Sequence, residues 1–214
     1  MNCTVFKRRK KRDGAAGKQV TVLFASRLIR EKGVDEFIKA ARMIRSQGMP
    51  VKFLLAGNIY EQNPSSLTQS DLESICRDGV VNLLGHIDDI RAILEDTDIV
   101  VLPSYREGCP RILIEAGAME IPIVTTDVPG CNAVVEHGLN GYLVPPRSIS
   151  ALAEAISQLA CDGALRQRFG KAGRRMVQSR FSESTVLENT IRVYRQLVGR
   201  TQVEAKDLRV RTTY

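Results

Sequence analysis

The sequence predicts an α/β fold, a doubly wound, Rossmann-like parallel sheet with helices on both faces. Short apolar runs alternate with amphipathic stretches at spacings of about 20 to 30 residues, the pattern of successive βαβ units. The apolar runs are continuous instead of alternating, as expected for strands buried on both faces. After Pro145 the pattern is helical only. The expected architecture is therefore about six strands followed by a C-terminal helical tail.

The six apolar runs are the expected strands, in chain order along the first two thirds of the sequence. They are Val20–Ala25, Val51–Ala56, Val80–Leu84, Ile99–Leu102, Ile121–Thr125 and Tyr142–Val144. The amphipathic stretches between them are the expected helices, and they are Val34–Arg45, Leu67–Arg77, Ile90–Glu95, Pro110–Met119 and Cys131–Glu136. Right-handed crossovers would connect the parallel strands.

Three further helices are expected after the last strand, at Ser150–Ala160, Ala164–Val177 and Glu183–Val198. Ser148 and Ser182 are suited to cap the first and the last of them. The last helix has one apolar stripe at helical spacing, made of Leu187, Ile191, Tyr194 and Val198. Three helices are more than one sheet face needs for cover, so we expect this last helix to pack against something outside the chain.

The composition is that of a soluble domain with a local excess of charge. The chain has 214 residues and a formal net charge of +7, but residues 7–12 are six consecutive Lys and Arg, and 7 − 6 leaves +1 elsewhere. A nucleic-acid partner is therefore not expected, although a binder that uses residues 7–12 is an alternative. The organisation expected is a basic flexible lead-in at 1–18, one domain at 19–200 and a tail at 201–214.

Targeting signals and cysteine usage indicate a cytoplasmic protein. No apolar run is long enough to cross a bilayer, and no apolar stretch follows the basic run as in a secretory signal. The five cysteines lie far apart without a CxxC pair, which favours reduced thiols over disulfides or a zinc site.

The two common phosphate-loop motifs are not the basis of the predicted function. GxGxxG is absent after the first expected strand, and the Walker-like Gly14–Lys18 has the wrong glycine spacing, with Gln19 in place of the magnesium-binding Ser or Thr. Arg27 and Lys32, with Gly33, do follow the first strand. Two cations beyond the carboxyl end of a strand, beside a helix N-terminus, are suited to hold a diphosphate without a metal ion. The alternative is a solvated basic loop.

Two carboxylates follow the fourth expected strand. Glu107 precedes a tight Gly108–Cys109–Pro110 turn, and Glu115 lies on the following helix. A carboxylate accepts hydrogen bonds from two sugar hydroxyls, and free amides around residues 108–112 would point at a sugar or phosphate, so this pattern suits a nucleotide-sugar. The alternative is simple charge patterning, because a glutamate near a helix start is stabilising by itself.

Five motifs together resemble one family. "ASRLIREKG", "GHIDD", "EGCPRILIEA", "TTDVPG" and "GLNGYLVP" occur in this order, and about residues 19–200 resemble the C-terminal half of glycosyltransferase family 4 (glycosyl transferases group 1). The resemblance implies a GT-B architecture, in which two Rossmann-like domains face each other, and it implies that this chain is the donor-binding one.

The resemblance also implies roles for named residues. Arg27 and Lys32 would contact the donor diphosphate and act catalytically on the leaving group. Glu107 would be the third catalytic residue and would contact the donor sugar beside the reacting carbon. Glu115 would accept hydrogen bonds from the ribose. The further donor-binding positions that it implies are His86 and Ile87 near the base, and Gly108, Cys109, Pro110, Arg111 and Ile112 around the sugar and phosphate.

The family is generally retaining and metal-independent, so the resemblance implies no cofactor and no metal ligand. Arg27 and Lys32 would then stabilise the charge that builds on the departing diphosphate. A charge-assisted bond contributes roughly 1.5–3 kcal/mol, so losing either cation is expected to cost about one to two orders of magnitude in rate.

Three positions depart from the family pattern. Glu120 replaces the usual glycine after the paired-glutamate helix, which predicts local strain of about 1 kcal/mol or a shifted helix end. The segment "AGNIYEQNP" is longer than the usual turn after the second strand, which alters one edge of the pocket. His137 is expected to be a surface-loop residue, and His86 to be structural instead of catalytic.

The expected function is transfer of a hexose from a nucleoside diphosphate-sugar to a saccharide or lipid-linked acceptor in surface polysaccharide biosynthesis. The acceptor would bind an N-terminal domain that is missing from this chain, whether as a gene fragment, a split enzyme or an isolated domain. Residues 7–12 would permit peripheral contact with the inner face of the membrane. The alternatives are a non-catalytic nucleotide-sugar-binding module and a nucleotide-sugar epimerase fragment.

Overall fold

The computed structural model of the chain describes residues 1–8 and 19–210, and side chains up to residue 198. Its centre is a parallel sheet of six strands in the spatial order β3-β2-β1-β4-β5-β6. The strands are β1 (Val20–Ala25), β2 (Val51–Ala56), β3 (Val81–Gly85), β4 (Ile99–Leu102), β5 (Ile123–Thr126) and β6 (Gly141–Val144). The predicted Rossmann-like α/β fold is confirmed, and each strand lies within two residues of its expected bounds.

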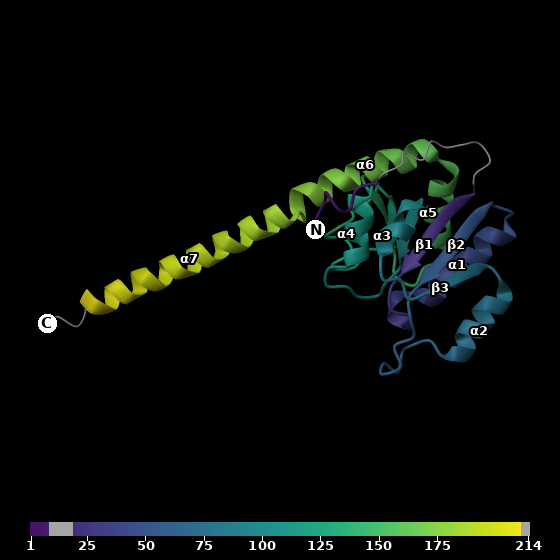
Figure 1. The fold of residues 1–214 in the computed structure, drawn as a ribbon, viewed down its shortest axis with the longest axis horizontal. Helices are drawn as coiled ribbons and strands as arrows, with labels where there is room; N and C mark the ends of the chain where they lie inside the picture. Colours follow the sequence, from purple (N-terminus) through teal and green to yellow (C-terminus); the bar gives the residue numbers. More distant parts are fainter. Residues whose placement is uncertain (9–18, 211–214) are drawn as a thin grey trace.

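Seven α-helices and one 3-10 helix accompany the sheet in the described part of the chain (Figure 1). They are η1 (Arg30–Lys32), α1 (Val34–Ser46), α2 (Gln69–Asp78), α3 (Ile90–Glu95), α4 (Arg111–Ala118), α5 (Ile149–Cys161), α6 (Gly163–Arg180) and α7 (Glu183–Val210). Ser148 and Ser182 accept hydrogen bonds from Ala151 N and Thr185 N, so both predicted caps are confirmed.

The prediction of a helix at Cys131–Glu136 is wrong. Residues 129–134 form turns with only local hydrogen bonds, such as Val135 N to Cys131 O at 2.9 Å. The buried Asn140 side chain then accepts from Glu136 N and donates to Val134 O. A side-chain amide thus takes the backbone groups that a continuing helix would have paired.

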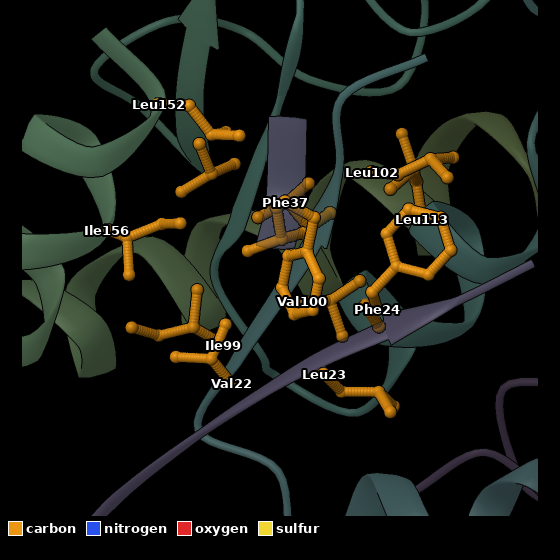
Figure 2. Close-up of a cluster of buried hydrophobic side chains, with 14 of the residues drawn as sticks. Val22, Leu23, Phe24, Phe37, Ile99, Val100, Leu102, Leu113, Leu152 and Ile156 are labelled. Carbon is orange, nitrogen blue, oxygen red and sulfur yellow. The ribbon is translucent and has the colours of Figure 1, made fainter. Parts of the chain in front are cut away.

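Two helical layers enclose the sheet. Helix α1 packs with α5, and α4 packs with α6. Helices α4 and α5 both contact β4 and β5 but have no substantial contact with each other, which places them on opposite faces of the sheet. Three aromatic rings fill the layer under α1, with ring centroids 5.3 Å apart for Phe24 and Phe37 and 5.9 Å apart for Phe37 and Phe53. Figure 2 shows this core continuing through β1 and β4 to Leu113 of α4 and to Leu152 and Ile156 of α5.

The sequence suggested that the first eight residues begin a flexible lead-in. In the structure they are instead bound to the body of the domain. Arg174 on α6 donates to Cys3 O at 3.0 Å and to Phe6 O at 3.1 Å, and the Met1 ammonium donates to Phe181 O at 2.8 Å. Arg8 donates to Thr97 O at 2.7 Å. Of the basic run at 7–12, residues 9–12 lie outside the described part, as does the Walker-like Gly14–Lys18.

Helix α7 projects away from the body, and its main contact is with α6 (Figure 1). The apolar stripe predicted from the sequence lies on this helix and is exposed, with Leu187 at 59% and Tyr194 at 66% of their surface. Within the described residues, no helix combines the length and the apolar character needed to cross a lipid bilayer.

Glu120 adopts the left-handed backbone conformation that glycine tolerates best. Its φ is +57°, directly after the end of α4, so the strain expected from the replaced glycine is present. A Cβ added to Gly170 of α6 would lie 2.0 Å from Glu120 O, so α6 packs directly against this bend. The helix end is therefore fixed by close backbone packing as well as by local preference.

Candidate functional site

The strand order creates a crevice between β1 and β4. From β1 the chain proceeds outward through β2 and β3, and from β4 it proceeds in the opposite direction through β5 and β6. The loops that leave the carboxyl ends of β1 and β4 therefore diverge, and ligands of open parallel sheets bind at such a switch point. Residues 26–33 form the first loop and residues 103–110 the second.

Lys32 and Glu107 connect these two loops. The Lys32 Nζ lies 2.6 Å from Glu107 Oε1, and Ser104 Oγ donates to the same oxygen at 2.7 Å. Only 17% of the Lys32 side chain and 9% of the Glu107 side chain are exposed. The structure thus brings together the residue predicted for the diphosphate and the residue predicted for the sugar.

Two glycines allow the loops to approach closely. A Cβ on Gly33, which has φ +75°, would lie 2.2 Å from Pro103 O. A Cβ on Gly130, in the "TTDVPG" motif, would lie 2.4 Å from Glu107 O. Side chains at either position would push apart the backbone segments that place Lys32 and Glu107.

Arg27 lies at the mouth of the crevice, directly after β1, and it is exposed. Its guanidinium carbon is 5.1 Å from the centroid of the Tyr60 ring, a cation–π distance. Among the described residues, no carboxylate forms an ion pair with Arg27. The charge is therefore available to an anion that enters from solvent.

Glu115 is buried on α4, and 8% of its side chain is exposed. Burial raises its pKa, and the Arg111 guanidinium, 3.3 Å from Oε1, partly opposes that rise. Arg111 itself is largely exposed at the start of the helix.

The turn before α4 presents a free helix start. Pro110 is the N-cap residue, so α4 begins at Arg111, one residue later than the expected start at Pro110, and no side chain caps the helix. Gly108, Cys109 and Arg111 are exposed, whereas Ile112 is partly buried. The amides of this first turn carry a partial positive charge that suits a phosphate or a sugar oxygen.

His86 and Ile87 lie at the end of β3, the edge strand, two strands away from β1. His86 is exposed, and its Nε2 is 3.3 Å from Asp88 Oδ1, while Ile87 is packed against the core. No bond joins these residues to the Lys32–Glu107 pair in the described part of the chain. They therefore lie at the carboxyl edge of the sheet, like the crevice loops, but at the far side of that edge, beyond β2.

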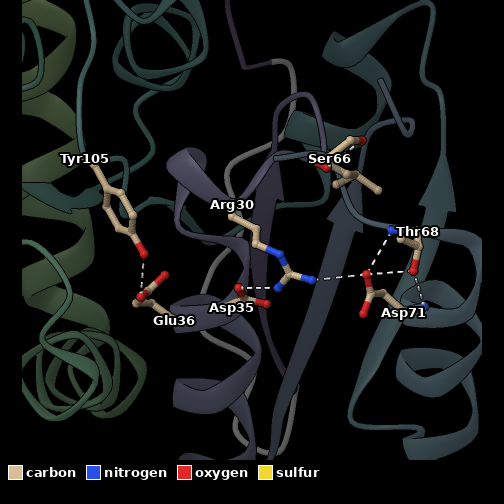
Figure 3. Close-up of polar contacts among 8 residues, drawn as sticks. Arg30, Asp35, Glu36, Ser66, Thr68, Asp71 and Tyr105 are labelled. Atoms are coloured by element: carbon tan, nitrogen blue, oxygen red, sulfur yellow. Dashed lines mark hydrogen bonds and ion pairs between the residues drawn. The ribbon is translucent and has the colours of Figure 1, made fainter. Parts of the chain in front are cut away.

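A cluster that the sequence analysis missed supports the second loop. Tyr105 Oη donates to Glu36 Oε1 at 2.7 Å, and the Arg147 guanidinium carbon is 4.6 Å from the centroid of the Tyr105 ring. Burial and the bond to Glu36 raise the pKa of Tyr105 to about 12. Figure 3 shows this Tyr105–Glu36 contact beside a second network, in which Arg30 bridges Asp35 of α1 and Asp71 of α2. The Tyr105–Glu36 bond joins residues 69 positions apart and the Arg30–Asp71 bond joins residues 41 positions apart, so periodicity could not reveal these two contacts.

Ser104 is a further residue that the sequence analysis missed. It is buried, and its backbone oxygen accepts a hydrogen bond from the Thr126 hydroxyl on β5. Its position three residues before Glu107 was the one available signal, because a serine at that spacing can reach a following carboxylate. With Lys32 it fixes the Glu107 carboxylate at the crevice.

The chain matches the family of glycosyl transferases group 1 over residues 5–176. It is 32% identical over 171 residues to the capsular polysaccharide biosynthesis glycosyltransferase CapM of Staphylococcus aureus, covering 80% of this chain and 44% of CapM. Sucrose-phosphate synthase from Thermosynechococcus elongatus superposes with a TM-score of 0.74 at 28% identity, covering 86% of this chain and 47% of the synthase. S. aureus TarM, solved with UDP among its ligands, superposes with a TM-score of 0.72 at 25% identity, covering 86% of this chain and 38% of TarM.

The chain thus spans less than half the length of each of these relatives. The family match nevertheless covers all the strands and the two crevice loops. The sequence motifs, the switch-point crevice and the match agree, and the chain belongs to the glycosyl transferases group 1.

Proposed function

We propose that this chain is the donor-binding half of a family 4 glycosyltransferase of GT-B architecture, which transfers a hexose from a nucleoside diphosphate-sugar. The observation that carries the proposal is the Lys32–Glu107 contact across the switch point, because it sets a cation for phosphate next to a carboxylate for sugar hydroxyls. Arg27 and the uncapped start of α4 add positive charge at the same sheet edge.

The proposed chemistry needs no metal ion. As the bond between the sugar and the diphosphate breaks, negative charge builds on the leaving phosphate, and Arg27 and Lys32 stabilise it. Glu107 holds the sugar hydroxyls beside the reacting carbon, and Glu115 binds the ribose. Retention of the anomeric configuration is part of the proposal, as in the family that the motifs resemble.

The proposed acceptor is a saccharide or a lipid-linked saccharide, bound by a domain outside this chain. CapM supports a place in capsular or other surface polysaccharide synthesis, since its name gives that process. The UDP in the TarM structure supports a nucleoside diphosphate donor. We propose that the assembled enzyme works in the cytoplasm, at the inner face of the membrane, with residues 7–12 near acidic lipid.

Isothermal titration of the chain with UDP, GDP, ADP and dTDP tests the donor site. We expect one of them to bind, with equal affinity in Mg²⁺ and in EDTA. Lys32→Ala should weaken that binding by about 10- to 100-fold, because a charge-assisted bond is lost. Lys39→Ala, an exposed lysine on α1, is the matched control and should bind like the parent chain.

Absence of binding to all four nucleotides, or equal loss in both lysine variants, would overturn the donor-site proposal. Transfer itself is tested after the chain is combined with the N-terminal domain of a group 1 relative. Release of nucleotide that depends on added acceptor supports a transferase. Donor binding without any such release supports a non-catalytic module, and acceptor-independent formation of an epimer supports an epimerase.

A further inference from the structure

The long segment between β2 and α2, residues 57–68, is fastened to the loop that carries Arg27. Backbone hydrogen bonds join them at both ends: Leu28 N to Asn58 O at 3.0 Å, Leu67 N to Leu28 O at 2.8 Å and Arg30 N to Ser65 O at 2.8 Å. Gly57 approaches so closely that an added Cβ would lie 1.8 Å from Ser26 O. The two segments therefore form one unit, and a side chain on residues 57–68 is placed relative to Arg27.

Tyr60 is the residue of this segment that faces Arg27. Its backbone N donates to Ser66 Oγ at 2.8 Å, which fixes the bend around the ring. The ring lies 5.1 Å from the Arg27 guanidinium carbon, and 41% of Tyr60 is exposed. No described carboxylate pairs with Arg27, so the ring face of Tyr60 is the charge-attracting partner that the structure shows for this exposed side chain.

The strand order places the start of the segment that carries Tyr60 at the carboxyl edge of the sheet, next to the loop of Arg27. Strand β2 lies between β1 and β3, so the segment that follows β2 lies between Arg27 and the turn that bears His86 and Ile87. The end of β2 is also bonded to the end of β3, through Gly57 N and Gly85 O at 2.8 Å. The segment that carries Tyr60 is thus joined both to the loop of Arg27 and to the end of β3, which precedes the residues proposed for the base.

We propose that Tyr60 is a positioning residue, whose ring orients the Arg27 guanidinium toward the donor diphosphate. This inference rests on the proposed donor site. The orienting interaction is made by the face of the ring, where the quadrupole attracts a cation, and the phenol hydroxyl takes no part in it. The longer turn after β2, which departs from the family pattern, thereby gains a function in this chain.

Titration with the nucleotide that binds best, at constant low salt, tests the inference with matched variants. Tyr60→Leu keeps bulk but removes the aromatic face, and it should weaken binding by about two- to five-fold, the usual range for an exposed cation–π contact. Tyr60→Phe keeps the face and should bind like the parent. In an Arg27→Met background, Tyr60→Leu should cause no further loss, because the cation on which Tyr60 acts is gone.

A measurement without nucleotide checks the contact itself. In ¹³C-arginine-labelled protein, the Arg27 Hδ signals, assigned by Arg27→Lys, should be shifted upfield by the ring and should return toward random-coil positions in Tyr60→Leu but not in Tyr60→Phe. Unchanged Arg27 signals in Tyr60→Leu would overturn the inference, as would equal losses of affinity in the Leu and Phe variants or additive losses with Arg27→Met. Failure of the parent chain to bind any nucleotide would overturn the proposed function, and the positioning role with it.

Discussion

Loop 103–110 and helix α7 are built on opposite principles. The loop is held from several sides, by Lys32, by the backbone of Glu31 through Tyr105 N at 2.8 Å, and by Gly130 against Glu107 O. Helix α7 has a regular apolar stripe in its sequence, yet this stripe faces solvent and the main contact of the helix is with α6. The comparison teaches that a strong periodic pattern identifies a face to be covered, whereas convergent backbone contacts identify a place where groups are fixed for chemistry.

The largest expected effect contrasts the body with α7. Phe37→Ala removes a fully buried ring that contacts Phe24 and Phe53, and it should lower the free energy of unfolding by about 3–5 kcal/mol. Leu187→Ala on α7 should change it by less than about 0.5 kcal/mol, because that side chain is mostly exposed. Urea unfolding followed by circular dichroism measures both. Similar losses in the two variants would show that α7 is covered in solution.

The next effect concerns how the crevice loops are fixed. Gly33→Ala places a Cβ against Pro103 O and also strains a left-handed backbone, so we expect a loss of about 2–4 kcal/mol of unfolding free energy. Gly79→Ala has a similar φ of +65° but open space around the new Cβ, so it should cost only about 1 kcal/mol. Equal costs would mean that the close approach of the loops contributes nothing.

A smaller effect, of opposite sign, is expected at the end of α4. Glu120→Gly relieves a left-handed conformation and should raise the free energy of unfolding by about 1 kcal/mol. The Arg174–Glu120 contact, at 3.9 Å and partly exposed, offsets little of this gain. Glu120→Ala removes the carboxylate but keeps the strain, so a similar gain in that variant would assign the effect to charge instead of backbone.

The weakest expected effect is the pH dependence that Glu115 gives to stability, because Arg111 opposes the burial that raises its pKa. A carboxyl group whose pKa is raised on folding binds its proton more tightly in the folded state. Its contribution to stability is therefore present below the ordinary glutamate pKa and is lost as the pH rises through the folded value. Glu115→Gln should lose less stability than the parent over that interval, and Arg111→Met should lose more. Parallel curves of unfolding midpoint against pH for the three proteins would contradict this.

Most of the fold could be predicted because buried strands in a parallel sheet are continuously apolar, and β1, β2 and β4 have the expected bounds. The failure at Cys131–Glu136 had a physical cause that local patterns do not contain, the Asn140 side chain. Residues 1–8 were expected to be flexible because they lack periodicity, but backbone carbonyls bound by Arg174 fasten them. Sequence periodicity reports which side chains share a face, and it carries no information on hydrogen bonds between a side chain and the backbone of another segment.

The candidate site was predictable in its members and not in its contacts. Arg27, Lys32, Glu107 and Glu115 could be chosen from motif order, and their roles stay predictions. The bond between Lys32 and Glu107 joins residues 75 positions apart, and the pairing of Tyr60 with Arg27 depends on how residues 57–68 bend. Such contacts follow from strand order and loop path, which no local spacing encodes.

The order of the strands also bears on when the crevice is formed during synthesis. Strand β1 can pair with β2 as soon as about residue 56 is available, but its other neighbour, β4, ends only at Leu102. The Glu107 turn and the Gly130 segment that backs it come later still. Non-local parallel pairing is slow, so the nascent chain carries an unpaired edge of β1 until β4 has emerged. The early residues Arg27 and Lys32 therefore wait for Glu107, and the crevice takes shape only when β4 closes the free edge of β1.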